Sequence, residues 1–174
     1  MHGERSLYES FWVNLRLVDV EIPEGPRFEH HVVRIPAPAA GCVVYDPARG
    51  VLLLWRHRFI TDTWGWEIPA GRVDGGETPI QAAARETVEE AGWRASHLEF
   101  MTVYNPCDGV VDQRFHLFVG TDVTYVGEPT DTSESEFVAW LPVDELRQEI
   151  HAGKVPDGLS LTALLWALNF GVIA

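Results

Sequence analysis

Hydrophobic and polar positions along the chain predict several strands before any helix. Segments 11–18 (FWVNLRLV) and 28–35 (FEHHVVRI) have strand-like composition with partial alternation, and the linker between them is rich in Pro and Gly. GCVVY (41–45) and VLLLWRH (51–57) flank the turn-like sequence DPARG, which predicts a β-hairpin. Because VLLLW contains no polar residue, we expect this strand to be buried on both faces.

One helix has clear boundary signals. Thr78 suits an N-cap, and Gln81 three residues later completes a capping box. Pro79 suits the first helical position, and Gly92 suits the position just past the C-terminus. We therefore expect a helix over residues 79–91.

A helical wheel separates this helix into a buried stripe and an acidic flank. The expected stripe contains Ile80, Ala84, Thr87 and Ala91, with Ala83 and Val88 at its margins. Glu86, Glu89 and Glu90 share the flank, where like charges at i, i+4 and the helix C-terminus both disfavour acids. A bound divalent cation would reverse that penalty, whereas a solvated acidic face is the plainer alternative.

The remaining pattern places further strands after this helix and helices at the end. The expected strands are 97–104, 114–123 and 137–141, and the expected helices are 143–153 and 160–170. This order lacks regular β-α-β alternation, so it predicts an α+β fold or a helix–sheet–helix sandwich. The apolar segment 159–174 is too short to cross a bilayer, and we expect it to dock on the core.

Composition narrows the class of partner. The 174 residues suit one domain with a small N-terminal extension, and 13 Lys+Arg against 26 Asp+Glu give a net charge of −13. This balance argues against nucleic acid and against an anionic membrane. The N-terminus has no apolar signal region, and Cys42 and Cys107 have no metal-ligand spacing, so we expect a cytoplasmic protein with free thiols.

The acidic helix lies within a longer pattern of fixed positions. Gly71 is followed after five residues by Glu77, and after seven more by Arg85-Glu86, Glu89-Glu90 and Gly92. This constellation resembles the Nudix box, G-x5-E-x7-R-E-U-x-E-E-x-G-U, with all seven fixed identities present. Only Thr87 departs, because the family usually has an aliphatic residue there.

The resemblance implies a Nudix-type α/β/α sandwich with a mixed sheet, and a metal-dependent hydrolase. It makes Glu86 and Glu90 direct ligands of Mg²⁺, with Mn²⁺ as an alternative, and Glu89 a ligand, an outer partner or part of the catalytic set. Glu77 and Arg85 either hold the loop against the helix or form a plain surface ion pair; both readings stay open.

Sequence around the box resembles the ADP-ribose pyrophosphatase-like branch of the family, over about residues 30–170. The lead-in WEIPAG (66–71) implies that the Ala70 carbonyl completes the metal site. VYNPCDG (103–109) matches the first proline of the branch's aromatic–Pro–x–Pro–Gly segment, but Asp108 replaces the second. This departure keeps other substrates in view.

The resemblance also assigns candidate substrate-binding and catalytic residues. Arg58 matches an arginine that contacts substrate phosphate, with a surface arginine as the alternative. Arg56 shares its strand face, and Arg34 is a weaker second candidate. The acidic loop before the last strand would supply the base that activates water, from Glu134 or Glu136. An ordinary solvated loop is the alternative there.

The expected reaction is hydrolysis of the pyrophosphate bond of a nucleoside diphosphate derivative, with ADP-ribose giving AMP and ribose 5-phosphate. Alternatives are another nucleotide (an NDP-sugar, a dinucleotide or a nucleoside triphosphate), or a Nudix module that binds nucleotide without cleaving it. The resemblance also implies a homodimer formed by an N-terminal β extension (1–36) attached to the hydrolase domain (37–174).

Overall fold

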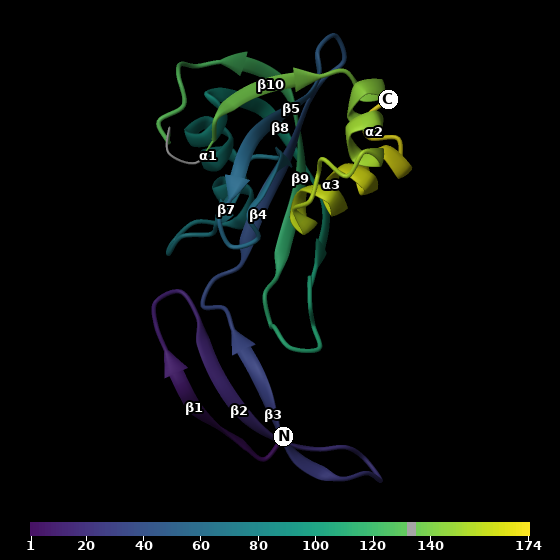
Figure 1. Ribbon diagram of the computed structural model, residues 1–174. Helices are drawn as coiled ribbons and strands as arrows, with labels where there is room; N and C mark the ends of the chain where they lie inside the picture. Colours follow the sequence, from purple (N-terminus) through teal and green to yellow (C-terminus); the bar gives the residue numbers. More distant parts are fainter. Residues whose placement is uncertain (132–134) are drawn as a thin grey trace.

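The computed structural model describes residues 1–131 and 135–174, and the strands form two separate sheets (Figure 1). The larger sheet has the strand order β10-β5-β4-β9-β8, with β6 beside β5 and β7 beside β4. Its strands are β4 (Ala39–Asp46), β5 (Gly50–Arg58), β6 (Thr63–Glu67), β7 (Ala70–Arg72), β8 (Trp93–Tyr104), β9 (Phe115–Tyr125) and β10 (Phe137–Leu141). The β4–β9 pair is parallel and the other pairs are antiparallel, so the sheet is mixed.

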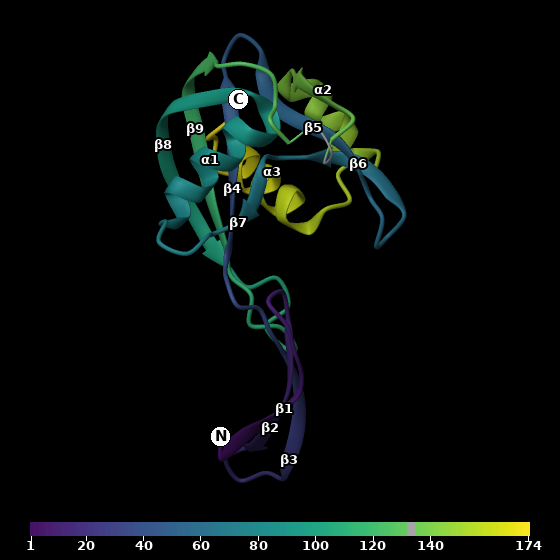
Figure 2. The same cartoon turned by 90° about the vertical axis from the view of Figure 1, so that its left-hand side faces the viewer.

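Helices cover both faces of this sheet. Helix α1 (Pro79–Ala91) lies on one face, and α2 (Val143–His151) and α3 (Gly158–Asn169) lie on the other (Figures 1 and 2). Each face has its own apolar cluster, one with α3 and one with α1. The expected α+β sandwich with a mixed sheet is confirmed.

The central hairpin forms where the sequence predicts it. Val51, Leu52, Leu53 and Leu54 are fully buried, because β5 is covered by helices on both sides. The apolar C-terminal segment also docks on the core, through the buried face of α3. No helix in the described part of the chain is long and apolar enough to cross a membrane.

Helix α1 has the predicted boundaries, but its buried face is rotated from the predicted stripe. Ile80 is 39% exposed, whereas Ala82 and Glu90 are buried together with Ala83, Thr87 and Ala91. Glu90 is interior because a buried arginine and a backbone N–H bond its carboxylate. A hydrophobicity pattern cannot register such pairing, because it treats every acid as an outward residue.

The smaller sheet is an N-terminal extension, seen in the lower part of Figure 1. It has the order β1-β2-β3, with β1 (Gly3–Glu9), β2 (Asn14–Glu21) and β3 (Arg27–Arg34). The sequence did not predict β1, because every residue of this strand is exposed and the pattern has no buried face. The extension meets the main body at Val33, whose N–H donates to Val110 O at 2.8 Å.

Candidate active site

Two glycines give the segment from β7 through α1 its shape. A Cβ on Gly71 would lie 2.0 Å from Oε1 of Glu86, so only glycine leaves room for that carboxylate. Gly92 ends α1 with φ +72°, and a Cβ there would lie 2.1 Å from the carbonyl oxygen of Gly127. The fixed glycines of the box therefore have local steric causes.

Arg85 ties the loop before α1 to the helix. Its Nε and Nη2 donate to the two carboxylate oxygens of Glu77 at 3.2 and 2.8 Å, and Nη2 also donates to Arg72 O at 3.0 Å. Glu77 also accepts from the Asp74 N–H at 2.8 Å. The hydrogen bonds from Arg85, and then from Asp74, lower the pKa of Glu77 below its usual value. Of the two open readings, these contacts favour the loop-holding one.

The third nitrogen of Arg85 joins two of the acids on α1. Nη1 lies 2.8 Å from Glu86 Oε1 and 2.9 Å from Glu89 Oε2. A positive group thus already bridges these carboxylates, in the kind of position that a cation would take. The like-charge repulsion along this face is offset by the guanidinium.

Glu90 has a different environment from the other two acids. Its side chain is only 3% exposed, with Oε1 3.1 Å from Arg56 Nη1 and Oε2 accepting from the Ala70 N–H at 2.9 Å. The two bonds hold both carboxylate oxygens beside the β6–β7 turn. Ala70 and Glu90 are therefore adjacent in the structure.

The donor set fits a hard divalent cation, although its members are not yet arranged as a coordination shell. Carboxylate and carbonyl oxygens are the ligands that Mg²⁺ prefers. Among the described residues, no three His, Cys, Asp or Glu side chains are grouped so that they could hold a metal ion. Arg85 would have to yield its bonds to Glu86 and Glu89 for a cation to enter.

The three candidate substrate arginines lie in three different settings. Arg58 is 48% exposed and lines a cavity of about 360 Å³ together with Ala70 and Gly71. Arg56 is 2% exposed and contacts Glu90, so its burial keeps it from such a surface contact. Arg34 belongs to the extension, where it pairs with Glu4 and Asp112. Of the three arginines, Arg58 alone therefore lines the cavity beside the box.

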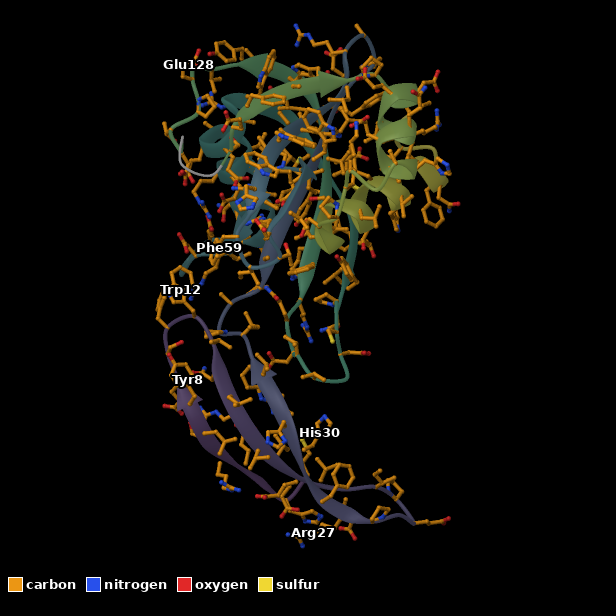
Figure 3. All side chains as sticks on the ribbon, viewed as in Figure 1. Tyr8, Trp12, Arg27, His30, Phe59 and Glu128 are labelled. Carbon is orange, nitrogen blue, oxygen red and sulfur yellow. The ribbon has the colours of Figure 1, made fainter. Side chains whose placement is uncertain are left out.

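The extension contributes residues to the same cavity that sequence reasoning missed. Trp12 lines it from the β1–β2 turn, which Figure 3 shows at the end of the extension nearest the main body. Beside it, the Arg72 guanidinium lies 4.1 Å from the Phe11 ring centre and 5.5 Å from that of Trp12. The available signal was the pair of adjacent aromatic residues Phe11 and Trp12.

The candidate catalytic loop is only partly described. Glu134 lies outside the described residues. Glu136 is exposed, its N–H donates to Trp55 O at 2.8 Å, and it lines a second cavity of about 520 Å³. Thr130 and Asp131 donate their N–H groups to Glu89 O at 2.9 and 3.1 Å, so the start of this loop is bound to the end of α1.

The two tryptophans before the box have different surroundings. Trp66 is buried, and its Nε1 donates to Glu149 at 2.9 Å. Trp64 is half-exposed and stacks on Trp55 with ring centres 6.4 Å apart. Trp66 is therefore a core residue.

Comparison with known proteins identifies the family. The NUDIX domain pattern matches residues 35–159, which include the whole box and the Arg58 strand. The chain belongs to the Nudix family. This membership, together with ADP-ribose pyrophosphatases among its relatives, indicates a pyrophosphohydrolase that acts on nucleotide derivatives.

Two relatives and one solved structure are similar to this chain. A CMP-5'-(N-acetyl-N-hydroxy-3-aminopropyl)phosphonate hydrolase of Streptomyces rubellomurinus is 38% identical, over 97% of this chain and 82% of that protein. An ADP-ribose pyrophosphatase of Bacillus subtilis is 30% identical, over 81% and 76% of the two chains. The crystal structure of an ADP compounds hydrolase has a TM-score of 0.85, 18% identity, and coverage of 97% and 91%, which supports the fold.

Proposed function

We propose that this Nudix protein uses Mg²⁺, or Mn²⁺ in its place, to hydrolyse ADP-ribose to AMP and ribose 5-phosphate. The observation that carries the proposal is that Arg58 and Ala70 line one cavity, while the Ala70 N–H bonds the buried Glu90 of the acidic helix. A cavity that has an arginine in its wall and adjoins the acids of α1 suits a diphosphate accompanied by cations.

The metal ligands proposed are Glu86, Glu90 and the Ala70 carbonyl, with Glu89 as a further ligand. A divalent cation bound there supplies charge neutralisation for the diphosphate oxygens and acidifies a water molecule. The Ala70 N–H and Arg56 hold Glu90 in place before any cation arrives. Gly71 keeps the space that the Glu86 carboxylate needs.

The chain's own groups then have separable roles. Arg58 contacts a phosphate from the cavity wall, because a guanidinium presents several donors in one plane. Glu136, or Glu134 beside it in the chain, accepts the proton of the attacking water. Arg85 holds the loop and the helix in register through Glu77 and Arg72.

A second substrate class has its own support. The relative at 38% identity is a hydrolase of a CMP-linked phosphonate, and it covers almost the whole chain. A nucleoside monophosphate joined to a phosphonate presents the same bridging oxygen and charged neighbours as a pyrophosphate. The site features described above suit either compound.

A substrate panel with Mg²⁺ or Mn²⁺ separates these candidates by product identity. The panel contains ADP-ribose, an NDP-sugar, a dinucleotide, a nucleoside triphosphate and a CMP-linked phosphonate. We expect AMP from ADP-ribose. Release of CMP without turnover of ADP-ribose would make the CMP-linked phosphonate the substrate in place of ADP-ribose. Tight nucleotide binding without any turnover would favour a binding module.

Two further proposals concern the protein's setting. We place it in the cytoplasm, in keeping with cysteines that are both free: Cys107 is exposed, and burial raises the pKa of Cys42 to about 12, which keeps that thiol protonated. We also propose a homodimer formed through the extension, residues 1–36, beside the hydrolase domain, residues 37–174.

A further inference from the structure

Four alternating charges form a chain behind the box, from the cavity to α1. Arg58 donates from Nε and Nη2 to the two carboxylate oxygens of Glu67, at 2.8 and 2.5 Å. Arg56 Nη1 lies 3.6 Å from Glu67 Oε2 and 3.1 Å from Glu90 Oε1. The order is therefore Arg58, Glu67, Arg56 and Glu90.

Strand geometry brings the members of this chain together. Arg56 and Arg58 are two residues apart on β5, so their side chains share one face of the sheet. Glu67 lies on β6, which pairs with β5 in an antiparallel register that places Gly65 opposite Arg56. Gly65 has no room for a side chain, because a Cβ there would lie 2.2 Å from Pro156 Cδ.

Burial makes the pairing obligatory for three of the four members. The side chains of Arg56, Glu67 and Glu90 are 2–3% exposed, whereas Arg58 is 48% exposed; Glu67 and Arg58 both line the cavity. A buried charge is costly unless it is paired and hydrogen-bonded. Two cations and two anions balance, so a charge change at one member must redistribute the bonds of its neighbours.

We propose that Glu67 is a positioning residue that couples Arg58, the phosphate contact, to Glu90, the metal ligand. The proposal rests on the function proposed above. Glu67 lines the cavity with a nearly buried side chain, and both of its carboxylate oxygens are taken up by arginines, so it acts through those two arginines. Glu67 bonds two nitrogens of Arg58 and so aims the remaining donors of that guanidinium toward the cavity. Glu67 also shares Arg56 with Glu90, so it sets how strongly Arg56 holds Glu90.

The coupling gives opposite effects for opposite charge changes. Glu67→Gln removes an anion, so Arg56 turns more fully to Glu90 and opposes a divalent cation there. Arg58→Met removes a cation, so Glu67 draws Arg56 away from Glu90 and a divalent cation binds more tightly. The double variant, with both Glu67→Gln and Arg58→Met, keeps one cation, Arg56, opposite one anion, Glu90, so the charges balance again.

Titration calorimetry of Mn²⁺ into the nucleotide-free chain tests this coupling without any turnover. Replacing an outer partner of a metal ligand costs roughly 10- to 100-fold in affinity, and we expect a loss of that order for Glu67→Gln. We expect tighter Mn²⁺ binding for Arg58→Met and near wild-type binding for the double variant. Glu149→Gln is the matched control, because Glu149 likewise accepts from two side chains, here Trp66 Nε1 and Lys154 Nζ, but lies on α2.

Each result supports or overturns the coupling. Three results overturn it. The first is wild-type Mn²⁺ affinity in Glu67→Gln, the second is a loss of affinity in both single variants, and the third is no Mn²⁺ binding by the wild-type chain. Circular dichroism verifies folding. Where one single variant does not fold, the direction of the change in Mn²⁺ affinity in the other variant decides. Failure of the proposed function is distinct, because it is seen as absent turnover by a wild-type chain that still binds Mn²⁺.

Discussion

At the scale of single residues, the structure explains the box positions by contacts that are mostly short and local. Gly71 gives space to Glu86, and Arg85 bonds Glu77, Glu86 and Glu89 at once. The sequence motif predicted these residues but not Glu67. The contacts of Glu67 depend on strands that meet only in the folded chain, so no spacing along the sequence reveals them.

Replacement of Gly71 by alanine tests the steric account. The added Cβ would meet Glu86 Oε1 at 2.0 Å and displace that carboxylate. We expect kcat/KM to fall by about 100-fold, since misplacing a catalytic group by about 1 Å has that order of effect. Gly75→Ala is the control, because nothing lies within 4 Å of its added Cβ. Equal activity of the two variants would contradict the account.

The pairing of Glu77 with Arg85 predicts a pH dependence of stability. The pKa of Glu77 is lowered in the folded chain, so its contribution to stability is present above the unfolded value of about 4.3 and lost as the pH falls through the folded pKa. Thermal melting of wild type and Glu77→Gln should differ at neutral pH and converge in acid. A gap in melting temperature that widens in acid would refute this sign.

At the scale of elements, predictability followed the strength of local signals. Helix α1 began and ended where its capping residues indicated, because those signals lie within the element itself. The short strands β6 and β7 were missed, because they consist of turn-like and mixed residues that pair only with the sheet. The buried face of α1 was also wrong in part, since Glu90 is interior only through its partners.

The end of α1 gives a stability prediction. Gly92 has φ +72°, and an alanine there would bring its Cβ to 2.1 Å from Gly127 O. The left-handed conformation alone costs an L-residue about 1–2 kcal/mol, so chemical denaturation of Gly92→Ala should show a loss of at least this size. Gly158→Ala, with open space at the added Cβ, should lose far less. Similar losses for both would argue against the steric cause.

At the scale of the whole molecule, the acid excess takes on a specific meaning. A net charge of −13 disfavours nucleic acid, yet two of these acids, Glu67 and Asp157, line one cavity together with Arg58 and Arg72. The extension adds a turn with Phe11 and Trp12 to the same region. Composition alone could not predict this arrangement, because these residues are far apart in the sequence and meet only in the folded chain.

The extension also gives a prediction about assembly. Figure 3 shows Tyr8 on β1, a strand whose residues are all exposed, and Leu7 beside it is 44% exposed. An edge strand that exposes apolar side chains is a template for pairing with another chain. Light scattering should give twice the chain mass of 19.5 kDa, and Leu7→Lys should lower it. A monomer at all concentrations would exclude the homodimer.

The central claim is metal-dependent pyrophosphate hydrolysis at the α1 acids, and phosphorus NMR of ADP-ribose with Mg²⁺ tests it most directly. We expect the two pyrophosphate signals to disappear and two monoester signals to replace them. We also expect chelation or Glu90→Gln to stop the change, and Glu145→Gln, on the exposed face of α2, to leave it intact. Persistent pyrophosphate signals with the wild-type chain, or full turnover by Glu90→Gln, would contradict the account.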